Sequence, residues 1–321
     1  MESTDFVQLA LKVLSCSQKE LAAQLNVSPT QITKWKKGEH MSLDMEVKFR
    51  HLTGIGDQSP SFILAAGSPE DAEKWDKLIH YIAELAHDNS ESGYYTYPLQ
   101  DEMDLLCVNT VRVLSELGIS LPAQFPPELD IDYENDDYDD NGKSPWELIE
   151  ENPHAYLIKK IYESLNGVYG FYQAYIDDLM NDDDLNLYDT PAVNIEPCLI
   201  SLAACKIDTS DITLPLFKEF RYRVIRDYEE WINIVKLAAF RARIPLKAEL
   251  CDLIYRTDGE LEMAAESESM GFNQDKLHPD IYMNELLVGM RLIHQVLPVI
   301  MKKLGINSDE FTVDESELRI E

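Results

Sequence analysis

The chain of 321 residues contains 59 Asp and Glu against 28 Lys and Arg, a formal net charge of −31, and its hydrophobic content is 45%. These values exclude a fully disordered chain and favour two or three folded domains. The sequence has no apolar run of the roughly 18 residues that would cross a bilayer, and no basic, cleavable signal peptide. Its five cysteines form no C-x-x-C pair, which favours reduced thiols in a cytoplasmic protein without membrane contact.

Charge is distributed unevenly along the chain. Residues 1–57 hold seven basic and seven acidic residues, so this segment is neutral and the remaining 264 residues (321 − 57) carry the whole surplus of −31. Gly, Asp, Ser and Pro cluster at 53–61, which is typical of a loop between domains. We therefore predict a small N-terminal domain over 1–60 and a larger acidic domain over 61–321.

Two short helices are predicted within residues 17–39. Ser17 is a favourable helix cap, and Glu20 three residues later completes a capping box. Ser28 caps the second helix, Pro29 occupies its first turn and Gly38 ends it. The residues expected on the buried faces are Leu21, Ala22, Leu25, Ile32 and Trp35. The opposite face of the second helix is polar and narrow, which suits entry into a DNA major groove.

Residues 6–54 resemble the Cro/C1-type (lambda-repressor-like, XRE) helix-turn-helix family. The matching features are the S-Q at 17–18, the L-A at 21–22, the N-V-S turn at 26–28, Ile32, and the W-K-K-G at 35–38. The resemblance covers about a sixth of the chain. It implies binding of double-stranded DNA, usually as a homodimer on a two-fold site.

The resemblance also implies which residues contact DNA. The position of Gln18 meets a backbone phosphate in this family, and the positions of Pro29, Thr30, Thr33 and Lys34 face base edges. Pro29 cannot make the hydrogen bonds that a glutamine often makes there, so base reading depends on the other residues. The candidate DNA-binding residues are Gln18, Ser28, Thr30, Gln31, Thr33, Lys34, Lys36 and Lys37.

The acidic domain is predicted to be helical as well. Apolar residues recur there at three- and four-residue spacing, and few segments alternate with period two, so the whole chain is assigned to the all-α class. A Pro-rich acidic segment over 122–145 is expected to be an irregular linker, and a second acidic break lies at 177–191. The predicted helices are 68–88, 99–118, 145–151, 153–180, 195–206, 213–243, 246–255 and 280–304.

No catalytic signature is evident, so we expect no enzyme activity, cofactor or metal. The sequence contains no G-x-S-x-G, H-E-x-x-H or P-loop. His80 and His87 lie seven residues apart, too far to share a metal easily. The acidic runs 128–140 and 177–184 are oxygen-rich like Ca²⁺ sites, but they lack the spacing of an EF-hand and are interpreted as solvated loops.

One segment of the acidic domain is basic. Residues 217–247 hold eight basic and four acidic residues, and the expected buried stripe is Phe217, Phe220, Val224, Tyr228, Trp231 and Val235. Two interpretations remain open. Its arginines pair with neighbouring carboxylates, or the segment forms an interface with a second subunit or with a nucleic-acid backbone.

These observations predict a sequence-specific DNA-binding transcriptional regulator. The N-terminal domain binds operator DNA, and the acidic domain dimerises and senses an effector or a protein partner. Two alternatives remain. The chain is an effector or toxin-like component of a defence system, with Arg291 and His294 in its active part, or an acidic inhibitor that mimics DNA.

Overall fold

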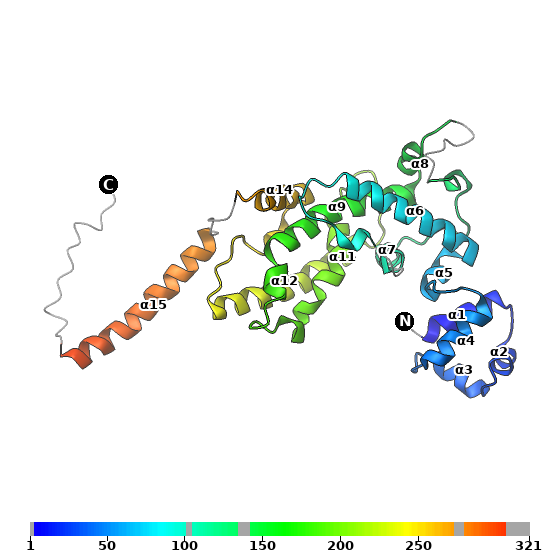
Figure 1. The fold of residues 1–321 in the computed structure, drawn as a ribbon, viewed down its shortest axis with the longest axis horizontal. Coiled ribbons are helices and arrows are strands. Elements are labelled where there is room, and N and C mark those ends of the chain that lie inside the picture. The colour runs from blue at the N-terminus through cyan, green and yellow to red at the C-terminus, as the bar shows by residue number, and fades with distance from the viewer. Residues whose placement is uncertain (1–2, 101–104, 134–141, 273–278, 306–321) are drawn as a thin grey trace.

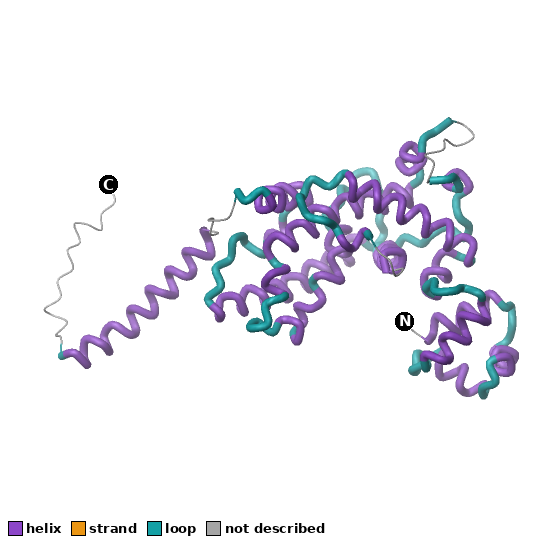
Figure 2. The backbone as a smooth tube through the Cα atoms, in the orientation of Figure 1, coloured by secondary structure: helices purple, strands orange, loops and turns teal. Residues whose placement is uncertain are grey.

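The chain is all-α in every region that the structure describes. The computed structural model describes the backbone of residues 3–100, 105–133, 142–272 and 279–305, and the side chains there except at 279–288 and 291. All regular elements within these ranges are helices, which confirms the predicted fold class (Figures 1 and 2).

Five short helices form a group at the N-terminal end of the molecule (Figure 1). They are α1 (Ser3–Val13), α2 (Gln18–Gln24), α3 (Pro29–Trp35), α4 (Leu43–Thr53) and α5 (Pro60–Ala66). α1 packs against all four of the others. The buried rings of Phe6 and Trp35 lie 6.0 Å and 5.9 Å from the ring of Phe49, so aromatic packing joins α1, α3 and α4.

α5 lies across the predicted boundary at residue 60. It contacts α1 of the N-terminal group and also α6 (Pro69–Asp88) and α7 (Leu105–Glu116). Phe62 and Ile63 are buried in this junction. The boundary itself stays a prediction, but the two parts share a packed helix.

The rest of the compact structure surrounds one long helix, α9 (Pro153–Tyr175), which is buried along most of its length. Six helices pack against it: α6, α8 (Pro145–Glu151), α10 (Asp177–Met180), α11 (Leu199–Ala204), α13 (Asp252–Tyr255) and α14 (Asp258–Ser269). α12 (Phe217–Ala242) packs against α10, α11 and α13. Short 3-10 helices complete the connections at Tyr97–Leu99, Pro127–Leu129, Leu187–Asp189, Pro191–Asn194 and Glu196–Cys198.

Two glycines let other backbones approach α9 closely. A Cβ atom at Gly167 would lie 2.3 Å from the carbonyl oxygen of Asp258, at the start of α14. A Cβ at Gly170 would lie 2.6 Å from the Cβ of Ser92. Between these glycines and α6, the buried amide of Asn166 donates to the carbonyl of Ala86 and accepts from the hydroxyl of Thr96. α9 is therefore held by close packing together with satisfied buried polar groups.

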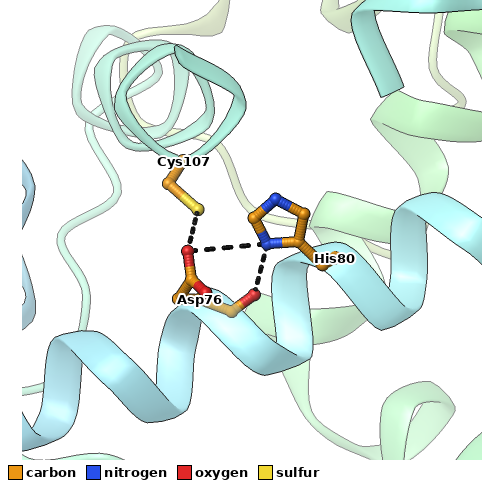
Figure 3. A group of neighbouring side chains, drawn as sticks. All are labelled: Asp76, His80 and Cys107. Carbon is orange, nitrogen blue, oxygen red and sulfur yellow. Dashed lines mark hydrogen bonds and ion pairs between the residues drawn. The ribbon is translucent and has the colours of Figure 1, made fainter. Parts of the chain in front are cut away.

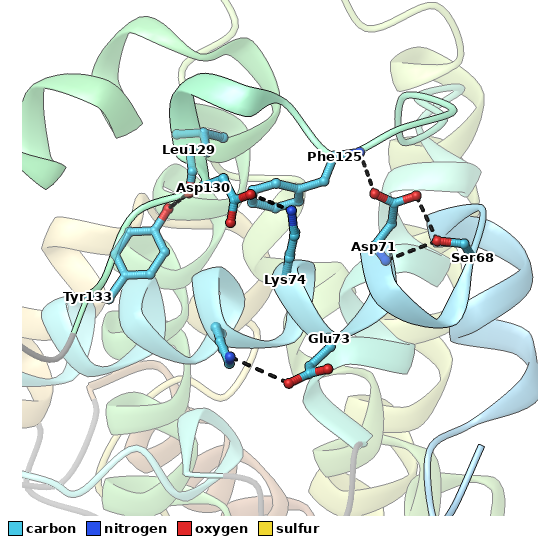
Figure 4. Close-up of polar contacts among 9 residues, drawn as sticks. Ser68, Asp71, Glu73, Lys74, Phe125, Leu129, Asp130 and Tyr133 are labelled. Atoms are coloured by element: carbon cyan, nitrogen blue, oxygen red, sulfur yellow. Dashed lines mark hydrogen bonds and ion pairs between the residues drawn. The ribbon is translucent and has the colours of Figure 1, made fainter. Parts of the chain in front are cut away.

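Residues 122–133 of the predicted linker are fixed to α6 (Figure 4). The amide of Phe125 donates to a carboxylate oxygen of Asp71 over 2.9 Å, and Lys74 pairs with Asp130. The Phe125 ring packs edge-on against Trp75 with a centroid distance of 5.0 Å. The segment is not α-helical here, but it is anchored, and residues 134–141 lie outside the description.

The predicted helix boundaries are close for α6, for α8 and for 280–304, which is α-helical from Pro279 to Leu304. Within the predicted helix 99–118, the described α-helix is Leu105–Glu116, and four other predictions need correction. The predicted helix 153–180 splits at Ile176, where φ is −120°. Within 246–255 only the last four residues are α-helical, and 213–243 becomes helical at Phe217, after Pro215. In 195–206 the α-helix starts at Leu199. The helices α1, α4, α5 and α14 lie outside the ranges predicted to be helical.

A final helix, α15 (Pro279–Leu304), extends away from the compact part in Figure 1. Within the described residues no other helix packs along it. Across the described ranges, no helix combines the length and hydropathy needed to traverse a membrane, α15 included.

Candidate nucleic-acid interface

α2 and α3 are joined by a tight turn whose geometry follows from local sequence. The hydroxyl oxygen of Ser17 accepts from the amide of Glu20, whose carboxylate accepts from the amide of Ser17, which completes the predicted capping box. Asn26 adopts a left-handed conformation at φ 55°, which asparagine tolerates better than most residues. Ser28 then caps α3 by accepting from the amide of Gln31 over 3.2 Å.

All eight predicted DNA-binding residues lie at the surface. Gln18 and Gln31 are half-buried, and the other six are exposed: Ser28, Thr30, Thr33, Lys34, Lys36 and Lys37. The predicted inward-facing residues are buried: Leu21, Ala22, Leu25, Ile32 and Trp35. α3 thus presents a polar side while its apolar side is fixed in the core of the N-terminal group.

Three of these eight side chains already have partners within the chain. The hydroxyl of Thr33 donates to the carbonyl of Pro29 over 3.1 Å, and Ser28 is engaged as the cap of α3. The ammonium of Lys34 lies 3.4 Å from the carboxylate of Glu39, with both side chains about half exposed. No side-chain partner is described for the other five, so they present their polar groups to solvent.

A set of contacts that sequence reasoning missed holds the far end of α3 in place. The hydroxyl of Ser3 lies 3.0 Å from the carbonyl oxygen of Trp35 and 2.7 Å from that of Glu39. The indole nitrogen of Trp35 donates to the carbonyl of His40. These contacts tie the start of α1 to the end of α3, so the polar side of α3 is held by tertiary structure.

The basic segment 217–247 corresponds largely to α12, and several of its cations pair internally. Arg223 lies 2.6 Å from Glu116, Arg226 lies 2.8 Å from Asp227, and Lys236 pairs with Glu249. The predicted apolar stripe faces inward: Phe220, Val224, Tyr228 and Val235 are buried, and Phe217 and Trp231 are half-buried. The four basic residues for which no ion pair is described are Lys218, Arg221, Arg241 and Arg243.

A cavity of about 230 Å³ lies between α12 and the start of α14, beside Lys206. The ammonium of Lys206 donates to the carbonyls of Ile254 and Arg256, at the end of α13. Burial lowers the pKa of Lys206 to about 8. The lysine acts chiefly as a cap for α13, because cations and donors are favoured at helix C-termini.

Asp76, His80 and Cys107 form the one group of possible metal ligands found in the described residues (Figure 3). The thiol of Cys107 donates to Asp76 over 3.3 Å, and Nδ1 of His80 lies 2.9 Å from the backbone carbonyl oxygen of Asp76. Carboxylate, imidazole and thiolate are all zinc ligands. In this structure Nδ1 of His80 and the thiol of Cys107 both contact Asp76, so the three groups form a polar cluster where α6 meets α7.

The other candidates from the sequence are not brought together. His87 stacks edge-on against Tyr95, away from this group. The acidic run at 177–184 begins with α10, and most of the run at 128–140 lies outside the described residues. His294 is exposed on α15, and the side chain of Arg291 lies outside the description.

The chain matches no protein-family model, no curated protein and no solved structure. Function is therefore inferred from the residues of the surfaces described above.

Proposed function

We propose that the chain is a sequence-specific DNA-binding transcriptional regulator that binds operator DNA as a homodimer. α2 and α3 act as the helix-turn-helix, with α3 as the helix that enters the major groove. The observation that carries this proposal is the combination, on one short helix, of a buried apolar side and an exposed side with groove-reading groups. Thr30 and Gln31 supply hydrogen-bonding groups for base edges, and Gln18 supplies a donor for a phosphate.

The lysines contribute non-specific attraction. Lys36 and Lys37 follow α3 directly, and both are exposed without a described partner. Each phosphate that they neutralise releases a counterion, so affinity falls as salt rises. The neutral charge of residues 1–57 leaves few such contacts per chain, and this scarcity favours a dimer that binds two half-sites.

The strong negative charge of the remaining chain is consistent with this division of labour. It repels the DNA backbone from most of the surface, so that α2 and α3 approach the duplex first. Internal pairing of Arg223, Arg226 and Lys236 supports a structural use for much of the basic character of α12, in place of a second DNA surface.

The test is selection of bound fragments from a random duplex library, with the purified full-length protein at near-physiological salt. We expect enrichment of a two-fold symmetric motif, because a dimer reads two copies of one half-site about one helical turn apart, or a multiple of that spacing. Absence of enrichment would overturn the proposal. Enrichment of an asymmetric motif would support sequence-specific DNA binding but would contradict binding as a two-fold symmetric dimer.

A further inference from the structure

α15 has an apolar face that no described part of the chain covers. Met290, Ile293, Leu297, Ile300 and Leu304 lie along it, and they are between 46% and 67% exposed. Leu292, Val296 and Val299 widen the same face and are similarly exposed. Large contiguous apolar patches are uncommon on monomeric proteins and mark interaction surfaces.

The spacing along this face is that of a helix that pairs with another helix. The five residues from Met290 to Leu304 recur at intervals of three, four, three and four, which is the a/d pattern of a coiled coil. The sequence continues the pattern towards the N-terminus with Leu286 and Met283. Pro298 lies about 120° around the helix from the centre of this line of residues, as follows from 100° per residue, so it is not part of the line.

We propose that α15 is the self-association element of this protein, and that two copies pair in antiparallel orientation along this face. The charge of α15 indicates that its apolar face is covered by α15 of a second copy of the chain. α15 contains three basic and two acidic residues, a net charge of +1 in a chain of −31, so two copies approach each other here with little repulsion. Over the rest of the chain, outside the neutral segment 1–57 and the basic segment 217–247, self-association would bring negative charges together.

Charge also selects the orientation. The acidic residues of α15, Asp280 and Glu285, lie in its first half, and Lys302 and Lys303 lie in its last turn. Parallel pairing would place lysines beside lysines. Antiparallel pairing over the whole helix, about 39 Å at 1.5 Å per residue, places each acidic end beside a basic end and also opposes the helix dipoles.

The apolar pattern fits the same register. When Pro279 of one copy lies level with Leu304 of the other, Met290 lies level with Ile293 of the second copy at the centre of the pair. In this register each a position lies level with a d position, as in antiparallel coiled coils. Pairing through α15 would form the homodimer that the proposed function requires. The biological role of this pairing rests on that proposed function.

The test measures the solution mass of the full-length protein, without DNA, over a range of concentrations. We expect about twice the chain mass of 36.8 kDa. Ile293→Glu with Leu297→Glu should reduce the mass to that of one chain. His294→Glu with Gln295→Glu adds the same negative charge on the polar side of α15 and should leave the dimer intact, while circular dichroism verifies that all variants stay folded.

Orientation is tested with a bismaleimide that spans about 10 Å, close to the distance between packed helices. A mixture of Asp280→Cys and Lys303→Cys chains should cross-link above the level of the unsubstituted protein, and each variant alone should not. Cross-linking of each variant with itself would overturn the antiparallel pairing.

A monomeric unsubstituted protein would overturn the inference, and so would a monomer that binds lipid vesicles or another protein through α15. A dimer that selects no DNA motif would defeat only the proposed function. A monomer that selects one would defeat the present inference and the homodimer of the proposed function, but would leave its DNA reading intact.

Discussion

Individual side chains on α3 divide into groups available to DNA and groups engaged within the chain. Gln31 and Lys34 are three residues apart, and both are candidate DNA-binding residues on α3. We predict that Gln31→Ala with Lys34→Ala abolishes binding to the selected DNA motif, because it removes a bidentate hydrogen-bonding group and a cation. Fluorescence anisotropy with labelled duplex measures the loss.

The matched control lies on α1. Gln8 and Lys12 have the same residue types, four residues apart on one helix, and both are exposed. Gln8→Ala with Lys12→Ala should leave affinity for the motif unchanged. The assignment of α3 would be contradicted if both double variants lost the same affinity for the motif. It would also be contradicted if Gln31→Ala with Lys34→Ala lost none.

Glu39 limits the contribution of Lys34, because its carboxylate lies 3.4 Å from the lysine ammonium. Glu39→Gln frees the cation and removes a negative charge close to the predicted DNA surface. We expect tighter binding, and a log–log dependence of affinity on salt that is steeper by roughly 0.9 if one further phosphate is neutralised. A salt titration of the binding constant checks this. Weaker binding would show that the ion pair positions the lysine.

Lys206 couples stability to pH. Burial lowers its pKa from 10.5 to about 8, so between these values the folded chain binds fewer protons than the unfolded chain. The free energy of unfolding therefore rises with pH in this window. Between pH 8 and 9.5 the free energy of unfolding of the unsubstituted protein should rise by about 2 kcal/mol more than that of Lys206→Met. This figure follows from 1.36 kcal/mol for each pH unit.

Urea unfolding at several pH values measures this gain. The buried tyrosines are present in both proteins, so their contributions cancel in the comparison. Burial raises the pKa of Cys205 to about 12, and loss of the Lys206 charge raises it further, so the folded thiol stays protonated across this window in both proteins. If the difference in the free energy of unfolding between the two proteins did not change with pH, the two carbonyls bound by Lys206 would offset the effect of burial on its pKa.

At the scale of elements, the close contact between α9 and α14 can be tested by substitution. Gly167→Ala places a Cβ against the carbonyl of Asp258 and forces the helices apart. We expect a loss of about 1–3 kcal/mol in the free energy of unfolding, measured by chemical denaturation. Gly259→Ala in α14 is the control, since a Cβ there meets no atom within 4 Å. It should be neutral or slightly stabilising.

Helices with strong local signals could be predicted from the sequence. The start of α6 follows from Ser68 and Pro69, and α8 begins at the capping box of Ser144 and Glu147. α14 has an equally good capping box at Thr257 and Glu260 but was missed. It buries only Leu261 and Ala265, so its apolar periodicity is weak, and its stability comes from contact with α9.

The buried and exposed sides of α3 could be predicted from the sequence, but the contacts that its side chains make could not. Caps and apolar spacing determine which side of α3 is buried, and those signals are local. The bond from Thr33 to Pro29 and the pairing of Lys34 with Glu39 depend on side-chain conformation, which sequence spacing leaves open. The support of α3 by Ser3 joins residues 32 apart in the chain, and no local pattern indicates it.

At the scale of the whole molecule, dimerisation and DNA binding should be coupled. In the proposed assembly the second half-site is bound at a high effective concentration, so a monomer loses affinity without losing any contact at α3. We expect Ile293→Glu with Leu297→Glu to weaken binding to the full two-fold site by roughly 10²–10⁴-fold. Binding to an isolated half-site should be unchanged, and anisotropy with the two duplexes separates these outcomes.

The burial of α9 has a consequence for synthesis of the chain. Translation completes this helix at Tyr175, but α14, which covers its glycine face, is complete only at Ser269. At about 5–20 residues per second, a nascent chain carries this apolar helix incompletely covered for roughly 5–20 seconds. Ribosome-bound intermediates that end between these two helices are therefore natural clients for chaperones, and a chain that terminates there would be prone to aggregate.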